Sequence, residues 1–163
     1  MKIFDCFIYF DEKDLAELRL NILKDHVDFF VICESEQNHR GDKKKLNFPI
    51  EKFNHIKEKI IYIKYEKFPE FNSTWDRQNY QRNYLINGLT KANNNDLILF
   101  SDADEIPNPK ILENYDNFCK NKVGIFVQKY FYYKLNLNAP NYSEWEGTRS
   151  CKKKDLKSFT WLR

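Results

Sequence analysis

Short apolar runs alternate with stretches of helical periodicity along most of this chain. Apolar runs of four to eight residues predict buried strands, whereas apolar residues spaced three and four apart predict helices. Strands that alternate with helices imply a mostly parallel sheet covered on both faces. We therefore expect one α/β domain over residues 1–163, with an irregular tail from about residue 138. The predicted strands are 3–10, 28–34, 59–64, 97–100 and 123–133.

Four helices are expected between these strands. Asp14 and Pro49 suit the beginnings of two of them, Ser73 or Thr74 caps a long helix over 74–92, and Asn108-Pro109 begins the last. The apolar positions assigned to the core side are Leu15, Leu18, Ile22 and Leu23 in the first, Ile50, Phe53 and Ile56 in the second, Trp75, Tyr84, Leu85 and Leu89 in the third, and Ile111, Leu112, Tyr115, Phe118 and Cys119 in the fourth.

Composition excludes several classes of protein. The net charge of +3 is too small to indicate a nucleic-acid partner, and no apolar run approaches the 18 residues of a membrane span. No secretory signal pattern opens the chain, and the four cysteines lack metal-site spacing, so we expect reduced, mostly buried thiols and a cytoplasmic protein.

The run 97–100 leads directly into three carboxylates, Asp102, Asp104 and Glu105. In an extended segment, Asp102 and Asp104 would point the same way. Two carboxylates on one side repel each other unless a cation lies between them, and Mn²⁺ or Mg²⁺ commonly joins carboxylates to a substrate phosphate. This segment predicts a metal-dependent enzyme that acts on a phosphorylated substrate.

Other interpretations of an Asp-x-Asp sequence remain open. Such acids often lie in solvated turns near a helix N-terminus. Phosphatases of the haloacid-dehalogenase type place Thr or Val where this chain has Ile106, calcium loops need a longer series of acids with a Gly, and phosphate loops need clustered glycines, of which this chain has only four in all.

Cationic and aromatic candidates are few. Arg77 and Arg82 lie on the predicted 74–92 helix, and either they or Arg40 could bind a diphosphate, the alternative being a solvated helix face. Trp75 and Trp145 could stack on a sugar or a base, with core packing as the alternative.

Four pieces of the sequence, in order, resemble glycosyltransferase family 17. They are Ile-Phe-Asp-Cys-Phe at 3–7, Phe-Val-Ile-Cys-Glu-Ser at 30–35, Trp-Asp-Arg-Gln-Asn-Tyr-Gln-Arg-Asn at 75–83, and above all Phe-Ser-Asp-Ala-Asp-Glu-Ile-Pro at 100–107, with the aromatic stretch at 130–136 in support. The resemblance covers about residues 1–149. Members of the family generally continue further, so the resemblance leaves three alternatives open: a fragment, a C-terminally truncated product, or an unusually short member.

The resemblance implies a GT-A-like (Rossmann-like) fold, a UDP-sugar donor (UDP-N-acetylglucosamine in the best-known members), a glycan acceptor and inverting transfer. By position, Asp102 and Asp104 would be the metal-binding pair, with Asp104 in direct contact and Asp102 reaching the ribose or a metal-bound water. Glu34 would lie near the nucleotide, and Arg82 would help to neutralise the diphosphate.

The catalytic base stays open among Glu105, Glu144 and Glu146. Two other functions use the same residues: a metal-dependent phosphohydrolase, and a non-catalytic nucleotide- or glycan-binding fragment.

Overall fold

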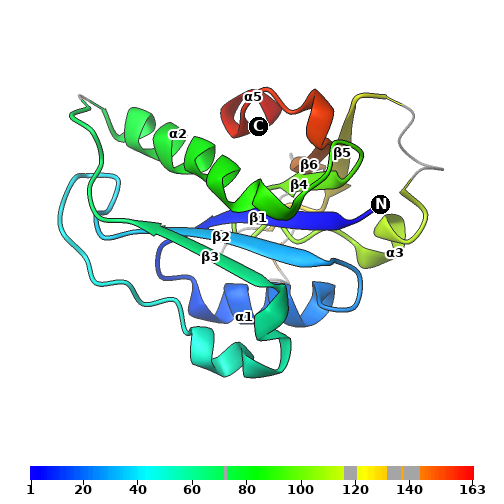
Figure 1. Ribbon diagram of the computed structural model, residues 1–163, viewed down its shortest axis with the longest axis horizontal. Coiled ribbons are helices and arrows are strands. Elements are labelled where there is room, and N and C mark those ends of the chain that lie inside the picture. Colours follow the sequence, from blue (N-terminus) through cyan, green and yellow to red (C-terminus); the bar gives the residue numbers. More distant parts are fainter. Residues whose placement is uncertain (72, 116–120, 132–136, 138–143) are drawn as a thin grey trace.

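A six-stranded mixed sheet forms the centre of the molecule, with helices on both faces (Figure 1). The computed structural model describes residues 1–71, 73–115, 121–131, 137 and 144–163. The strand order is β3-β2-β1-β4-β6-β5. The strands are β1 (Ile3–Tyr9), β2 (Phe29–Ser35), β3 (Ile60–Tyr65), β4 (Leu97–Phe100), β5 (Val123–Gln128) and β6 (Trp145–Lys152). The α-helices are α1 (Lys13–Leu23), α2 (Thr74–Tyr84), α3 (Pro109–Leu112) and α5 (Phe159–Leu162), and the 3₁₀ helices are η1 (Ile50–Lys59), η2 (Leu85–Lys91) and η3 (Lys153–Asp155).

The first four strands are parallel, as the sequence pattern predicted. The last two are antiparallel: β6 pairs with β4 on one side and with β5 on the other. The prediction of an irregular tail from about residue 138 was therefore wrong for Trp145–Lys152. This strand is rich in small and polar residues, and its place inside the sheet buries Gly147, Thr148 and Ser150 without an apolar run to announce it.

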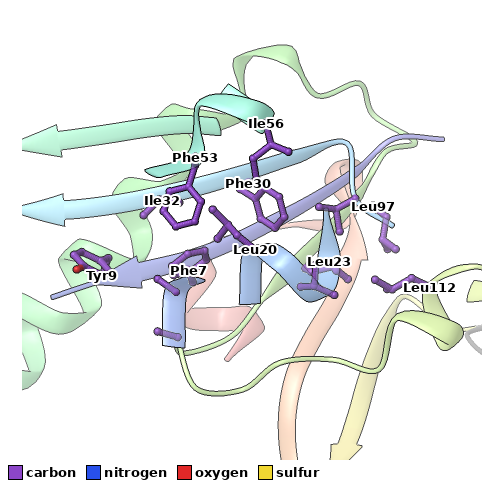
Figure 2. Close-up of a cluster of buried hydrophobic side chains, with 14 of the residues drawn as sticks. Phe7, Tyr9, Leu20, Leu23, Phe30, Ile32, Phe53, Ile56, Leu97 and Leu112 are labelled. Atoms are coloured by element: carbon purple, nitrogen blue, oxygen red, sulfur yellow. The ribbon is translucent and has the colours of Figure 1, made fainter. Parts of the chain in front are cut away.

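Alternate residues of the central strands point to opposite faces, as β geometry requires. On one face, Phe7, Phe30 and Leu97 pack against α1 and η1, and on the other, Phe4, Val31 and Ile98 pack against α2, η2 and α5. Figure 2 shows the first of these cores, in which Leu20 and Leu23 meet the sheet. Helices cover both faces of the parallel strands, which explains why these strands are apolar along their whole length.

The inward face of α1 differs from the prediction. The buried residues are Ala16, Arg19, Leu20 and Leu23, whereas Leu15, Leu18 and Ile22 are 38%, 45% and 37% exposed. The sequence pattern failed because a charged residue, Arg19, occupies the centre of the buried face. The predicted cap at Asp14 was also wrong, since α1 begins at Lys13 and Glu12 occupies the N-cap position.

The predicted 74–92 helix is two elements. Ser73 caps α2 by accepting a hydrogen bond from the Asp76 amide, as expected, and the chain then continues as the 3₁₀ helix η2. Gly88 lets η2 approach the sheet closely, because a Cβ there would lie 2.3 Å from Val31 Cγ1. Trp75 is 69% exposed and does not belong to the core, while Leu85 and Leu89 do.

Several smaller expectations have clear outcomes. Asn108 caps α3 and Pro109 occupies its first turn, as predicted. The strand expected over 123–133 ends at Gln128 within the described residues, and Phe118 and Cys119 lie outside them. Cys6, Cys33 and Cys151 are buried free thiols. In the part of the chain that the structure describes, no helix has the length and apolar character needed to cross a bilayer.

Candidate active site

The candidate site lies where the order of the strands reverses. From β1 the chain proceeds outward to β2 and β3, and it then returns to place β4 on the other side of β1. The carboxyl ends of β1 and β4 are therefore neighbours, with Cys6 opposite Phe100. Such a switch point is where open α/β sheets bind ligands, and the segment 101–108 leaves β4 at this place.

The three carboxylates of this segment lie on a turn. The Glu105 amide donates to the Asp102 carbonyl at 3.1 Å, and the Asp102 amide donates to the Glu105 carboxylate at 3.0 Å. The expectation of an extended segment was wrong, because the strand ends at Phe100. The shared environment of Asp102 and Asp104 comes from this turn and not from strand alternation.

Arg19 fixes the turn from inside the protein. Its guanidinium and the carboxylate of Asp5 are both fully buried and form a two-pronged ion pair at 2.8 and 2.7 Å. The remaining donors bind the Ser101 hydroxyl at 2.7 Å and the carbonyls of Asp102 and Glu105 at 2.9 and 3.2 Å. Every N–H group of Arg19 thus has a partner: two bind Asp5, and the other three bind the turn.

Sequence reasoning missed Arg19. A signal was available: it lies three residues after Ala16 and one before Leu20, on a helix that follows a strand carrying Asp5. Charged residues at such inward positions are almost always paired.

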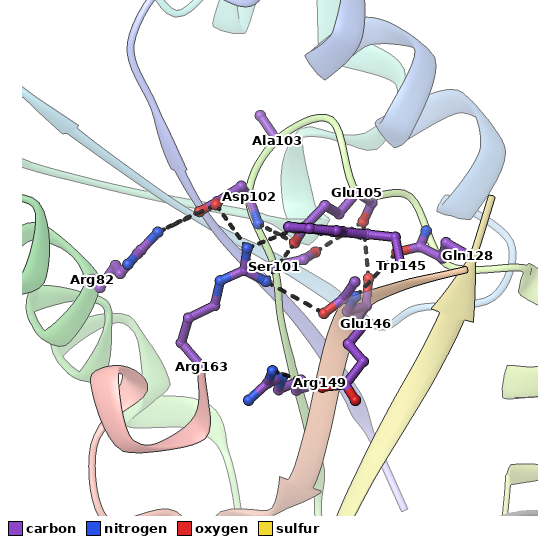
Figure 3. A network of polar contacts seen from close by, with 12 residues as sticks. Arg82, Ser101, Asp102, Ala103, Glu105, Gln128, Trp145, Glu146, Arg149 and Arg163 are labelled. Carbon is purple, nitrogen blue, oxygen red and sulfur yellow. Dashed lines mark hydrogen bonds and ion pairs between the residues drawn. The ribbon is translucent and has the colours of Figure 1, made fainter. Parts of the chain in front are cut away.

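Asp102 is held between two arginines (Figure 3). Arg82 Nη2 lies 3.1 Å from Asp102 Oδ1, and Arg163 Nη2 lies 3.2 Å from Asp102 Oδ2. The sequence assigned Arg82 to the substrate diphosphate, but in the structure its guanidinium neutralises Asp102. Arg163, at the end of α5, was not foreseen.

Glu105 is buried, and four donors surround its carboxylate. Trp145 Nε1 and Arg163 Nη2 lie 2.6 and 2.8 Å from Oε1, while the Asp102 amide and Arg163 Nη1 lie 3.0 and 2.9 Å from Oε2. A carboxylate has about four acceptor positions, so none remains for a substrate hydroxyl. This arrangement suits a residue that positions Trp145 and Arg163, and it disfavours the predicted role of Glu105 in catalysis.

Asp104 is the contrasting member of the three. Its side chain is exposed, and the described residues give it no ion-pair partner. Partial desolvation of the carboxyl group raises the pKa of Asp104, a hydrogen bond to its own backbone lowers this pKa, and the negative charges of Glu105, Asp102 and Glu12 raise it again, so that the net shift is upward. A group in such surroundings gains most from a bound cation.

Two cavities open beside the turn, and both are lined by Asp102, Asp104 and Leu15. The larger, of about 590 Å³, is bounded by Trp145, which stacks on Tyr130 at 5.2 Å between ring centroids. The smaller, of about 280 Å³, extends under the carboxyl end of β1 toward the loop after β2 and the helix α2. The further residues of the smaller cavity are Ile8, Tyr9, Phe10, Glu12, His39, Gln78, Gln81 and Ala103.

The structure places Glu34 at the same edge of the sheet but in a closed environment. Its carboxylate is fully buried and accepts from Lys44 Nζ, the Asn47 and Phe48 amides and the Tyr62 hydroxyl. Glu34 therefore anchors the loop after β2, in place of the predicted contact with the nucleotide.

Three other predicted substrate residues lie outside both cavities. Arg77 donates to the carbonyls of His39 and Phe71 and so ties the loop after β2 to α2. Arg40 and Trp75 are exposed to solvent. The predicted stacking role is compatible with the position of Trp145 and not with that of Trp75.

The donor set can be compared with the needs of a divalent cation. In the described part of the chain, no group of three or more His, Cys, Asp or Glu side chains is arranged to hold a metal. A Mg²⁺-type site needs only one or two carboxylates when substrate phosphates complete it. Asp104 meets that need, and Asp102 could join it only by exchanging its arginine partners.

Comparison with known proteins gives the family. The model of glycosyltransferase family 17 matches residues 1–155. Human and rat proteins named beta-1,4-mannosyl-glycoprotein 4-beta-N-acetylglucosaminyltransferase are each 33% identical to this chain over 106 residues, which is 59% of this chain and 20% of the relative. The matched stretch thus spans about a fifth of the length of these relatives. Because the family model covers nearly all of the sequence, the chain belongs to glycosyltransferase family 17.

Proposed function

We propose that this domain binds a UDP-sugar and transfers the sugar, N-acetylglucosamine by analogy with the named relatives, to a glycan with inversion at the anomeric carbon. The proposal includes a GT-A-type arrangement of the α/β domain, with the donor at the switch point between β1 and β4. The observation that carries it is the acidic cavity at that point, which shares Leu15, Asp102 and Asp104 with a second cavity lined by Trp145 and Tyr130.

A bound cation follows from the charges of the smaller cavity. Glu12, Asp102 and Asp104 line it, and its lining contains no Lys or Arg among the described residues. A diphosphate would be repelled by three carboxylates unless a divalent cation accompanied it. We assign Mn²⁺ or Mg²⁺ to this position, held by Asp104 and, after exchange of its partners, by Asp102.

The cation, when bound, would neutralise the charge that develops on the leaving diphosphate. The protein's own residues supply the remaining requirements. Arg19 fixes the direction of Asp104 through the backbone of the turn. Arg82 and Arg163 pair with Asp102 and so reduce the negative charge that the donor meets.

We place the acceptor sugar in the larger cavity, where the Trp145 ring is held by its bond to Glu105 and by stacking on Tyr130. Aromatic rings bind the apolar faces of sugars. Glu105 is saturated with donors and does not suit the base that deprotonates the acceptor hydroxyl. Glu144 and Glu146 are exposed, but neither lines this cavity, so the base is left unassigned.

A thermal-shift screen of nucleotide sugars with and without Mn²⁺ tests the proposal. We expect UDP-N-acetylglucosamine to raise the midpoint only when Mn²⁺ is present, because a ligand that binds the folded state stabilises it. Asp104→Ala should abolish this shift and any turnover, while Asp76→Ala, on the exposed side of α2, should retain both. Equal shifts without the metal, or cleavage of simple phosphate esters, would contradict the transferase assignment.

A further inference from the structure

His39 is a half-buried histidine that the chemistry described above does not use. It lies in the loop after β2 and lines the smaller cavity. His39 Nε2 lies 2.7 Å from Gln81 Oε1. The other hydrogen bonds of the Gln81 side chain determine which of these two atoms is the donor.

Gln81 is buried on α2, and its amide group has a fixed orientation. Its Nε2 donates to the Cys33 carbonyl at 2.9 Å and approaches the Tyr9 carbonyl at 3.5 Å. A flipped amide would point its oxygen at two carbonyl oxygens, so Oε1 must face His39. Because an amide oxygen only accepts, His39 Nε2 must carry the proton.

A neutral imidazole with a proton on Nε2 has its acceptor lone pair on Nδ1. No described residue provides a hydrogen bond to that nitrogen. Burial lowers the pKa of His39, and the positive charge of Arg82 lowers this pKa too, against the opposing effects of the Gln81 bond, Glu12 and Asp102. The ring therefore stays neutral near pH 7.

The surroundings of His39 differ from the acidic part of the cavity. Gln78 and Gln81 provide amides, and Phe10, 48% exposed, provides a flat apolar surface. A neutral acceptor does not attract phosphate, whereas a nucleobase offers both a flat face and an N–H group. The side-chain amide of Gln78, which forms no hydrogen bond with the described residues, can donate to a carbonyl beside such an N–H.

We infer that His39, oriented by Gln81, recognises the uracil base of the donor by accepting a hydrogen bond from its N3–H at Nδ1. This inference rests on the proposed function, because it needs a nucleotide in the smaller cavity. It assigns selection of the base to the loop after β2 and leaves the diphosphate to the acidic turn. Cytosine, whose N3 carries no proton, would face the Nδ1 lone pair with another lone pair.

Calorimetric titration in the presence of Mn²⁺ tests the inference with UDP, 3-methyl-UDP, CDP and 2′-deoxy-UDP as probes. For the unaltered protein we expect 3-methyl-UDP and CDP to bind at least about tenfold more weakly than UDP. In His39→Ala, UDP should weaken by about the same factor, and the penalty of the N3 methyl group should fall to within about twofold. Leu15→Ala, which alters the same cavity without a polar change, should keep the full penalty.

His39→Asn provides a second variant that can retain an acceptor oxygen, and thermal midpoints confirm that each variant folds. An equal methyl penalty in the unaltered protein and in His39→Ala would overturn the inference. It would also be overturned if the unaltered protein bound 3-methyl-UDP and CDP as tightly as UDP, bound only 2′-deoxy-UDP more weakly, and lost this preference in His39→Ala, because that result would place the ribose at His39. Absence of binding by every uridine nucleotide would refute the proposed function itself, and with it this inference.

Discussion

Two arginine–carboxylate clusters lie on opposite sides of the turn at 101–105, and they differ in their contact with water. Arg19 and Asp5 are completely buried, and all their donors and acceptors are satisfied inside the protein. The Asp102 carboxylate is 30% exposed beside two cavities and shares its charge with Arg82 and Arg163. The first cluster can only support the turn, whereas the second can exchange partners when a ligand enters.

The largest effect is expected at the buried cluster. Arg19→Met should lower the free energy of unfolding by about 3–5 kcal/mol, because it leaves the Asp5 charge unpaired in the core. Urea denaturation measures this loss. The apolar double variant Asp5→Leu with Arg19→Met should recover only part of it, since the carbonyls of Asp102 and Glu105 would still lack their donor. Full recovery would mean that the turn does not depend on Arg19.

The solvated cluster should be less sensitive. Asp102→Asn should cost about 1–2 kcal/mol in unfolding free energy, because the Asp102 carboxylate is 30% exposed and Arg163 can turn toward solvent, although the Arg82 side chain is nearly buried. The same urea titration, repeated at high salt, checks this value. A cost equal to that of Arg19→Met would erase the distinction between the clusters.

Trp145→Phe removes one hydrogen bond and leaves an aromatic ring. The loss of the bond to Glu105 should lower the unfolding free energy by about 1 kcal/mol, with stacking on Tyr130 retained. Thermal denaturation followed by circular dichroism measures it. A larger loss would show that Trp145 supports the fold more than it shapes the cavity.

The smallest change in unfolding free energy is expected at Asp104, where substitution should stabilise the protein and not destabilise it. Because the folded state raises the pKa of Asp104 above its usual 3.8, ionisation of this carboxylate opposes folding. The stability that protonated Asp104 contributes is fully present below pH 3.8 and is lost as the pH rises through the pKa of Asp104 in the folded protein. Asp104→Asn should therefore raise the unfolding free energy slightly at pH 7, by about 0.5 kcal/mol or less given its exposure.

A pH series of denaturation curves for Asp104→Asn and the unaltered protein measures this difference. The gain should disappear in acid, where Asp104 is protonated. A destabilised Asn variant at pH 7 would show that Asp104 has a structural role, which its lack of an ion-pair partner among the described residues argues against.

Much of the fold followed from local patterns. The four parallel strands, the caps at Ser73 and Asn108 and the position of the acidic turn were all predictable, because apolar runs and capping residues act within a few positions. Strand β6 was not, since its small polar residues become buried only when β4 and β5 flank it.

The site shows the same division. Asp102, Asp104 and Trp145 could be selected as candidates from their types and spacing, whereas Glu34, Arg77 and Arg82 were assigned to the substrate although each binds another part of the protein. Charged residues look alike in a sequence whether their partner is a ligand or the protein itself.

The sequence by itself determined a mostly parallel α/β sheet with three carboxylates at the end of its fourth strand, because hydrophobic periodicity and turn chemistry are local properties. Only the tertiary structure decided which of these carboxylates has no ion-pair partner among the described residues. Ion pairs such as Arg19 with Asp5 and Arg163 with Glu105 join residues 14 and 58 positions apart, and their geometry exists only after the sheet has assembled.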